Sequence, residues 1–437
     1  MTTRFVSFDG TESCSAELHE PDRYRALVAS LDTASPCAIR GSGLSYCLAS
    51  AGDAVRTVST RHFDRILGFD PQQRLVTVEA GVTVGDLADF ALSKGCYFPV
   101  LPGYPTITVG GCAAFNVHGK TQHNVGHFSD HVESLTLLHP DHGEIRCSRT
   151  ENADVFELTL GGMGLTGCIV DMTLRLQPLA GRSVRRIAHA VADVGEAVHL
   201  MRDLAGRADA LYSWNDLNRR GSRFGTGVVY EERFEADELP GSAEYGPMRL
   251  GSVSRRPFAF YGRASSAALN RLFLTRERLR PTTVRSVHDA SFPIDGNEVY
   301  FALFGKRGLR EYQLLVTHDA WPSAAREVRL ALTRAAVPAT LGSLKLFAGS
   351  PRHLWFRGDG VCLTIDVPAI PAGARLFGEL DRIAIEHGAL VNVSKDSRLD
   401  ARTLRRIFPE ADVFAQALET FDPKRRFDSA LRRRLEL

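Results

Sequence analysis

The chain has 437 residues, 44% of them hydrophobic and 24% charged, and a formal net charge of +2. That length allows two or three domains with full cores, and the near-neutral charge gives no general case for a nucleic-acid-binding protein. Eight scattered cysteines without a C-x-x-C pair argue against a disulfide framework and against a zinc site, so no metal is expected.

The N-terminus, the longest apolar runs and the C-terminal composition bear on where the protein is located. The N-terminus lacks an apolar signal core, and no run approaches eighteen apolar residues. We therefore expect a cytoplasmic protein, or one that sits peripherally at the inner face of the cell membrane. The last fourteen residues include six basic ones, a composition more typical of a solvated helix end than of a phospholipid contact.

The first 183 residues predict an α+β unit. Thr83 and Asp86 form a capping box that begins a helix, and Gly95 is placed to end it. Other elements are read from hydrophobic periodicity. They are a helix over 21–31 and strands over 76–80, 132–138 and from 168 onward.

Three glycine loops lie within the first 170 residues, at 40–46, 101–120 and 161–167, each beside β-type sequence. Glycines let a backbone approach a flat or anionic group closely, because no Cβ stands in the way. Tight turns in a β-rich domain explain one such loop but explain three poorly. The three loops together indicate one large cofactor held by backbone amides.

The third loop matches the dinucleotide-binding pattern G-x-G-x-x-G over 162–167. That pattern should open a helix, whose N-terminus then binds the pyrophosphate. Here it precedes residues 168–176, in which apolar side chains alternate as in a strand. The sequence therefore argues against a Rossmann domain.

From about residue 185 the chain changes character. Nine arginines and a single acid, Glu277, lie between 249 and 285, interleaved with aromatic residues. This composition favours exposed flexible loops first, membrane or lipid contact second, and single-stranded nucleic acid a distant third. The elements expected in this part are strands over 227–230, 312–316, 361–367 and 390–393 and helices over 193–205, 323–336 and 376–386.

Seven motifs, in order along almost the whole chain, carry a resemblance to a known family. They are RGSGLSY (40–46), VEAGVTVGDL (78–87), the block over 100–120, LGGMGLTG (160–167), KRGLREYQ (306–313), VSKDSR (393–398) and RRRLEL (432–437). The sequence resembles the flavoprotein oxidases of the vanillyl-alcohol oxidase class, with a PCMH-type FAD-binding fold, and within it the decaprenylphosphoryl-β-D-ribose 2′-oxidases. The resemblance implies a two-domain α+β fold. A discontinuous FAD domain over 1–184 and 390–437 would enclose a substrate domain over 185–389, built on an antiparallel sheet.

The same resemblance implies FAD as the cofactor. Relatives that bind it covalently often carry histidine where this chain has Leu44, so we expect a noncovalent flavin. Loops of this kind can bind pyrophosphate as a nest of N–H groups, without a helix dipole. The residues expected to line the FAD are Arg40, Gly41, Ser42, Gly43, Leu44, Ser45, Tyr46, Pro102, Gly103, Tyr104, Thr108, Gly110, Gly111, Ala114, His118, Met163, Gly164, Gly167, Ile169 and Lys395.

The chemistry expected is oxidation of a secondary alcohol to a ketone, which removes a hydride from carbon and a proton from oxygen. By resemblance, Lys395, His118 and Tyr46 are the catalytic residues. Lys395 would handle the proton or stabilise the reduced flavin. Expected to contact the substrate are Lys120 and Lys345, which could reach a phosphate as point charges, together with Gln313, Thr364 and Glu311.

Two positions depart from the family pattern. Thr364 stands where the family carries a cysteine, and the nearest cysteine, Cys362, points to the same face of the strand one repeat earlier. Glu311 stands where a glutamine is expected, and an extra carboxylate beside a phosphate is repulsive unless it is paired. Both departures bear on the substrate more than on the reaction.

Three functions remain open at this point. The first is oxidation of C2 of a polyprenylphosphoryl pentose, as the first half of an epimerisation. Its partners would be a short-chain dehydrogenase/reductase and an electron acceptor, either a quinone or O2; no nucleic acid takes part. The second is oxidation of a free alditol or sugar lactone, which needs no phosphate-binding lysine. The third is a flavin- or lipid-binding module without catalysis.

Overall fold

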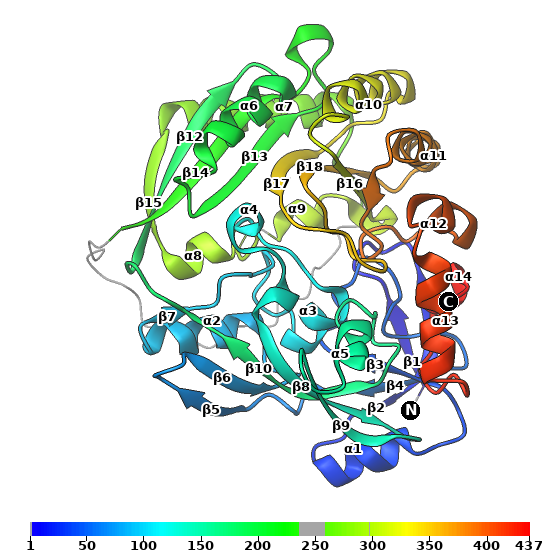
Figure 1. Cartoon of the computed structure of the whole chain (residues 1–437). Helices are drawn as coiled ribbons and strands as arrows, with labels where there is room; N and C mark the ends of the chain where they lie inside the picture. Colours follow the sequence, from blue (N-terminus) through cyan, green and yellow to red (C-terminus); the bar gives the residue numbers. More distant parts are fainter. Residues whose placement is uncertain (1, 236–257, 297) are drawn as a thin grey trace.

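The structure, a computed structural model, describes residues 2–235, 258–296 and 298–437 (Figure 1). Two sheets form its N-terminal part. The first, in the order β1-β2-β4-β3, has parallel pairs between β2 and β4 and between β3 and β4. The second is a five-stranded antiparallel sheet in the order β5-β6-β10-β8-β9. The strands are β1 (Thr2–Val6), β2 (Ser13–His19), β3 (Cys37–Arg40), β4 (Arg56–Ser59), β5 (Ile66–Asp70), β6 (Leu75–Glu79), β8 (Val132–His139), β9 (Gly143–Ser148) and β10 (Cys168–Arg175), besides the small pair β7 (Cys96–Tyr97) and β11 (Gln177–Pro178).

The helices of this part connect the strands and carry the loops that matter for the site. Thr83 caps α2 through its side chain, which accepts from Asp86 N, as the capping box predicted. Thr108 caps α3 in the same way by accepting from Gly111 N. The helices are α1 (Tyr24–Leu31), α2 (Val84–Ser93), α3 (Val109–Phe115), α4 (Gln122–Val125) and α5 (Ala153–Thr159).

Two four-stranded antiparallel sheets form the middle of the chain, in the orders β13-β14-β12-β15 and β17-β18-β16-β19. β13 and β17 lie side by side, and Ser213 Oγ accepts from Leu344 N across this junction at 2.9 Å. The strands are β12 (Ser183–Val191), β13 (Ala210–Asp216), β14 (Thr226–Glu235), β15 (Thr282–Ser286), β16 (Leu309–Val316), β17 (Leu341–Phe347), β18 (Gly360–Pro368) and β19 (Leu390–Val391).

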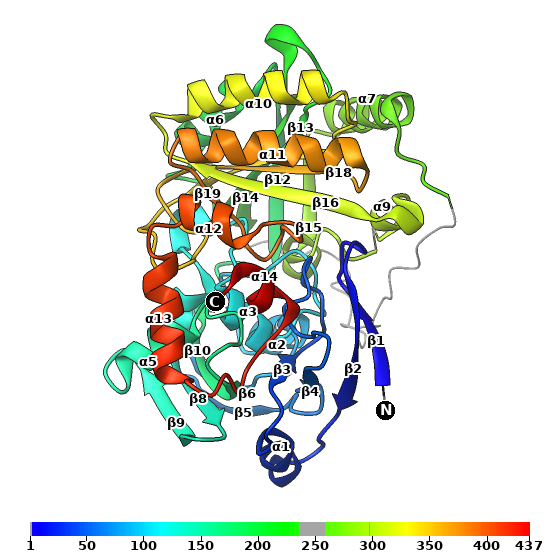
Figure 2. The ribbon, with the colours of Figure 1, turned by 90° about the vertical axis from the view of Figure 1, so that its right-hand side faces the viewer.

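Helices cover one face of the second of these sheets. α10 (Trp321–Ala335) and α11 (Pro371–Glu386) stack on each other above β16 and β18 (Figure 2). Tyr312, Leu314 and Val316 of β16 join the largest apolar core of the described residues on that face. The alternate side chains of the strand therefore point the other way, toward the glycine loops. The remaining helices of the middle part are α6 (Val194–Leu204), α7 (Arg263–Leu279), α8 (Val287–Ser291) and α9 (Val299–Ala302).

The C-terminal segment returns to the first sheet. It forms α12 (Ala401–Ile407), α13 (Ala411–Phe421) and α14 (Ala430–Leu435). Cys37 N of β3 donates to Arg426 O at 2.8 Å, and Asp428 N donates to Cys37 O at 2.9 Å. β19, just upstream, pairs with β16 of the middle part. The mixed α+β architecture with antiparallel sheets is as predicted, whereas the domain boundaries at 184/185 and 389/390 stay a prediction.

Most of the expected strands and helices are present within one to three residues, and residues 168–175 form a strand rather than a helix. The expectation of loops over 249–285 is wrong where the structure describes it. Residues 263–279 form the seventeen-residue helix α7, and residues 282–286 form β15. Alanine, leucine and arginine favour helix, and α7 buries Ser266, Asn270, Leu274 and Glu277 on one face. Residues 249–257 lie outside the described residues.

The C-terminal basic run is only partly solvated, because Arg432 and Arg434 contact other parts of the protein while Arg433 is exposed. The Arg432 side chain is 2% exposed; its Nε donates to Leu437 O at 2.9 Å and its Nη1 to Phe427 O. Arg434 pairs with Glu12 and donates to Leu399 O. Backbone carbonyl oxygens outside the helices, including that of the last residue, therefore accept from these guanidinium groups. Within the described residues no helix combines the length and apolar character needed to cross a membrane.

Replacing Arg432 with Met should therefore lower the free energy of unfolding by about 3 kcal/mol, since a buried partner is removed from several oxygens. The matched change Arg433→Met removes a guanidinium that is 46% exposed beside Asp428 and should cost less than about 1 kcal/mol. Urea unfolding followed by circular dichroism compares the two. Equal losses would show that the burial of Arg432 contributes nothing.

Candidate active site

The glycine loops and one face of the sheet β17-β18-β16-β19 surround a single cavity of about 1010 Å³. This volume lies at the upper end of the range for ligand pockets, about 300–1,000 Å³. One end is lined by backbone and small side chains of residues 41–46, 101–119 and 163–169, and the other by polar side chains of the strands. All three predicted loops therefore meet at one place.

The first loop has the features of an anion nest. Within the described residues, the backbone N–H groups of Ser42 to Tyr46 donate no hydrogen bond to the protein. Ser42 Oγ fastens the loop to Thr106 O, and a Cβ on Gly41 would lie 2.1 Å from Thr108 Oγ1. The loop is thus held against the start of α3 with its donors free for a ligand.

The third loop leaves room where a cofactor would lie. Gly164 has a φ of +73°, and a Cβ there would meet no atom within 4 Å. Gly164 lines the cavity, so the absent side chain keeps cavity space open. The free donors at one loop and the open space at another fit the pyrophosphate and the flat ring system of FAD.

Most residues predicted to line FAD do line the cavity, but two do not. Arg40 turns away from it, donates to Ser50 Oγ at 2.9 Å and lies over the Phe5 ring, so it supports the loop from behind. Tyr104 is 8% exposed and reaches Glu298 Oε1 at 3.4 Å. Neither residue lines the cavity, because a loop motif fixes its backbone path but not the direction of its flanking side chains, and their contact with FAD stays a prediction.

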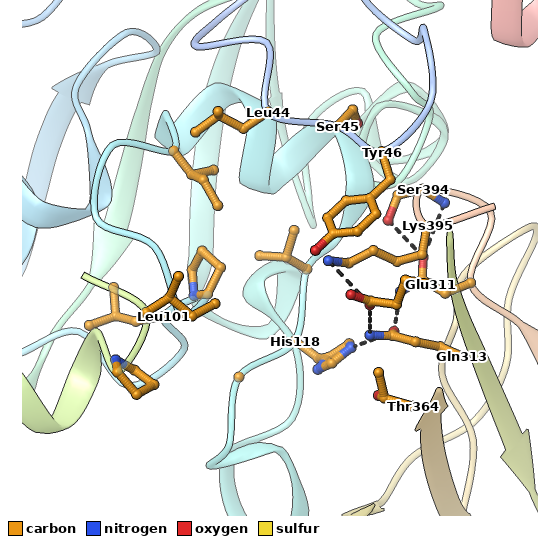
Figure 3. Close-up of a pocket in the computed structure, with 18 of the residues that line it drawn as sticks. Leu44, Ser45, Tyr46, Leu101, His118, Glu311, Gln313, Thr364, Ser394 and Lys395 are labelled. Carbon is orange, nitrogen blue, oxygen red and sulfur yellow. Dashed lines mark hydrogen bonds and ion pairs between the residues drawn. The ribbon is translucent and has the colours of Figure 1, made fainter. Parts of the chain in front are cut away.

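At the sheet end, the predicted catalytic residues come together (Figure 3). Lys395 Nζ lies 3.8 Å from the centre of the Tyr46 ring and 3.4 Å from Glu311 Oε1. Burial, followed by the negative charges of Glu311 and Asp366, raises the pKa of Tyr46 well above its usual range, so its hydroxyl stays protonated. An ammonium is thus held between an aromatic face and a carboxylate.

His118 belongs to the same hydrogen-bond chain. Gln313 Oε1 accepts from Asn392 Nδ2 at 2.7 Å and lies 3.2 Å from His118 Nε2, while Gln313 Nε2 donates to Glu311 Oε1 at 2.7 Å. This arrangement assigns the ring proton of His118 to Nε2. Burial and the charge of Lys345 lower the pKa of His118 well below its usual range, so the ring is neutral. Its Nδ1 is buried without a hydrogen bond among the described residues.

The two lysines predicted to reach a phosphate differ sharply. Lys120 is already engaged, because its Nζ contacts Glu232 Oε2 at 2.6 Å and also Ala290 O. Lys345 has no hydrogen bond or ion pair within the part of the chain that the structure describes, although it is half-buried in the cavity wall. Burial lowers the pKa of Lys345, against the smaller raising effects of Cys362 and Glu311.

Thr364 lies opposite Gln313, and Asp366 lies opposite Glu311, in the register of β18 and β16. The polar wall residues that were not found from the sequence include Asp366, Ser343 and Asn392. The first two lie two positions from Thr364 and Lys345 and so share their faces of β18 and β17. The alternation of side chains along a strand was therefore the signal that would have identified Asp366 and Ser343 as wall residues. Cys362 packs with Leu315, Phe347 and Phe356 instead of lining the cavity.

The glycine loops at 41–46 and 163–167 and the polar side chains around Lys395 are typical of a flavoprotein oxidoreductase. Comparison with known proteins agrees with this class. Residues 17–148 match the family described as FAD binding domain. The chain is 28% identical to decaprenylphosphoryl-beta-D-ribose oxidase of Mycolicibacterium smegmatis, over 91% of this chain and 88% of that protein. It is 30% identical to an uncharacterised protein of Streptomyces coelicolor, over 82% of this chain and the whole of that protein. A shorter match, 32% identical over 31% of this chain and 23% of the relative, is to L-galactono-1,4-lactone dehydrogenase 1 of Oryza sativa subsp. japonica.

The chain belongs to the FAD-dependent oxidoreductases with a PCMH-type FAD-binding domain, and it is similar to decaprenylphosphoryl-β-D-ribose oxidase along most of its length. Its cofactor is FAD, and it is an enzyme of the oxidase and dehydrogenase class that acts on sugar-like CH–OH groups. These findings confirm the predicted family, cofactor and reaction class.

The assignment of the glycine loops to FAD binding can be tested without any substrate. Gly41→Val would drive a side chain into Thr108, which caps α3, and overpacking of this kind costs about 1–3 kcal/mol. We expect FAD affinity to fall at least about tenfold, a change that corresponds to about 1.4 kcal/mol. The ratio of flavin to protein absorbance in the purified variant measures it. Gly68→Val, in β5 with no atom within 4 Å of its Cβ, is the matched control, and equal flavin content in both would contradict the assignment.

Proposed function

We propose that the enzyme oxidises the C2 hydroxyl of a pentose carried on a polyprenyl phosphate to a ketone, with hydride transfer to flavin N5. The product would pass to a short-chain dehydrogenase/reductase, which reduces it from the other side and completes an epimerisation at C2. A quinone or O2 would reoxidise the flavin. The similarity to decaprenylphosphoryl-β-D-ribose oxidase over 91% of the chain supports this substrate class.

The observation that carries the proposal is the position of Lys395 between Tyr46 and Glu311 at the sheet end of the cofactor cavity. FAD supplies the hydride acceptor. The residues of this cluster hold a sugar hydroxyl, since the neutral His118 offers an unpaired Nδ1 and Lys395 offers N–H donors. Such groups orient the reacting carbon and receive or stabilise charge as the hydroxyl loses its proton.

A phosphate on the substrate fits the unpaired cations of the same cavity. Lys345 is the better ligand of the two lysines, because Glu232 already neutralises Lys120. Arg276 of α7 and Arg285 of β15 also line the cavity. On α7, Leu272 and Leu279 are 69% and 77% exposed, which supports peripheral contact with a membrane that carries the lipid.

A free alditol or sugar lactone is the second candidate, favoured by one specific observation. Glu311 and Asp366 place two carboxyl groups in the wall next to the reacting region, and carboxyl groups are good partners for the hydroxyls of an uncharged polyol. The partial match to a lactone dehydrogenase supports the same alternative.

An anaerobic titration distinguishes the two candidates. FAD-loaded protein is mixed with polyprenylphosphoryl ribose, and in parallel with free alditols and lactones, while the visible flavin absorbance is recorded. Bleaching by the lipid-linked pentose alone is the expected result. Bleaching by a free polyol alone would replace it with the second candidate, and no bleaching by any of them would reject both.

Lys395→Met should lower kcat by about 10²–10⁴, the range for a group that handles protons or stabilises developing charge, and should leave FAD bound. Single-turnover flavin reduction measures the rate, and the flavin-to-protein absorbance ratio measures occupancy. Lys94→Met, at the end of α2, is the matched control and should behave as wild type. Unchanged reduction in Lys395→Met would remove this lysine from the mechanism.

A further inference from the structure

Two carboxyl groups lie next to each other on adjacent strands of the sheet β17-β18-β16-β19. Glu311 on β16 and Asp366 on β18 are directly opposite in the antiparallel register, which brings their Cβ atoms to about 4.5–5.5 Å. Their residues are 5% and 1% exposed, and both line the cofactor cavity. Two buried carboxylates at such a distance repel each other strongly, so the pair is not stable with both groups ionised.

The hydrogen bonds of the pair indicate which of the two carboxyl groups carries a proton. Asp366 Oδ2 accepts from Tyr300 OH at 2.8 Å, whereas Asp366 Oδ1 is buried and has no hydrogen-bond donor among the described residues. Glu311 Oε1 accepts from Gln313 Nε2 and faces the Lys395 ammonium. A proton on Asp366 Oδ1 would satisfy that atom and donate to Glu311, while Lys395 balances the charge that stays on Glu311.

The charged and titratable surroundings agree with this distribution. Burial and the Glu311 charge raise the pKa of Asp366 well above its usual range, against the smaller lowering effects of Tyr300 and Lys395. The groups that face the pair from neighbouring elements are Lys345 on β17, Cys362 on β18, Tyr300 on α9, and Tyr46, Tyr261 and Lys395 on loops.

We propose that Asp366 is protonated and hydrogen-bonded to Glu311, and that the Glu311 carboxylate accepts the hydroxyl proton when the sugar is oxidised. This inference rests on the proposed function. The substrate carbon loses a hydride, with both electrons of the C–H bond, to the flavin. The hydroxyl oxygen loses its proton to a Glu311 oxygen, and the C–O bond becomes a carbonyl. Asp366 is the positioning residue, because it touches Glu311 and not the reacting atoms.

The assignment gives Lys395 a narrower role. With a carboxylate at 3.4 Å to accept the proton, the lysine can remain an ammonium throughout the reaction. Its charge then pairs with Glu311 and would remain available to the cofactor. The carboxylate at 311 would thus be a feature of this chain's own chemistry.

Infrared spectroscopy tests the resting state without substrate. Wild-type holoenzyme at neutral pH should show the C=O band of a protonated carboxylic acid, and Asp366→Asn should lose it. Glu311→Gln should keep the band but shift it, because the acceptor changes from a carboxylate to an amide. A spectrum of Asp366→Asn that matches wild type in this region would overturn the proton assignment.

Kinetics test the proton acceptor, using whichever sugar bleaches the flavin. Glu311→Gln should lower the rate of flavin reduction by about 10²–10⁴ and abolish its decline at acid pH, since the group whose protonation causes that decline is gone. Asp366→Asn retains an N–H donor to Glu311 and should stay within about tenfold of wild type. Glu327 is a partly exposed carboxylate that pairs with His387, so Glu327→Gln is the matched control for the same chemical change.

The outcomes separate this inference from the proposed function. If Glu311→Gln raises KM but keeps kcat and the acid-side decline, then Glu311 only binds a hydroxyl and the acceptor role is rejected. If no sugar bleaches the wild-type flavin, the proposed function fails, and the infrared result still decides whether Asp366 carries a proton. Flavin absorbance of each variant verifies that the cavity has kept its cofactor.

Discussion

The antiparallel register of β16 and β18 is the constraint on which the site depends. It sets Glu311 opposite Asp366 and Gln313 opposite Thr364, all on the face that looks toward the cofactor loops. Because side chains alternate along a strand, a slip of one residue would turn this polar set into the apolar core under α10 and α11. The apolar alternate residues, such as Leu314 and Ile365, are fully buried in that core and fix the register. Core packing on one face thereby positions the chemistry on the other.

Among the described residues, several polar atoms that have no protein partner border the cofactor cavity. The N–H groups of Ser42 to Tyr46, the ammonium of Lys345 and Nδ1 of His118 all border the same cavity. Lys120 and Arg432, by contrast, have protein partners in Glu232 and Leu437 O. Because unsatisfied buried groups destabilise a fold, a ligand that completes the groups at this cavity would stabilise it. A pyrophosphate, a sugar hydroxyl and a phosphate have the chemistry that each of these places lacks.

The sequence predicted the parts of this site that depend on backbone. Glycine loops and the Thr83 cap follow from local conformational preferences, so their positions could be read directly. Asp366 could not be assigned a role from the sequence, because the role proposed for it depends on contact with Glu311. That residue is 55 positions away in sequence but directly opposite in the register of the sheet. The same holds for Arg40 and Arg432, whose directions are set by Ser50 and by Leu437 O. Helix α7 was missed for another reason, since its arginine content obscured strong helix propensity.

The departure at position 311 is understandable as a change in charge balance. An added carboxylate in a cavity proposed to take a phosphate would oppose binding if it stood alone. Here Lys395 lies 3.4 Å from it, and the proton proposed for Asp366 would remove the second negative charge, so that Glu311 would face Lys395 and Lys345 as the single anion. One cation is then left in excess for an anionic substrate group. On the proposed assignment, the carboxylate and a substrate phosphate are compatible only if Asp366 is neutral, so the protonation of that residue would link the reaction chemistry to the choice of substrate.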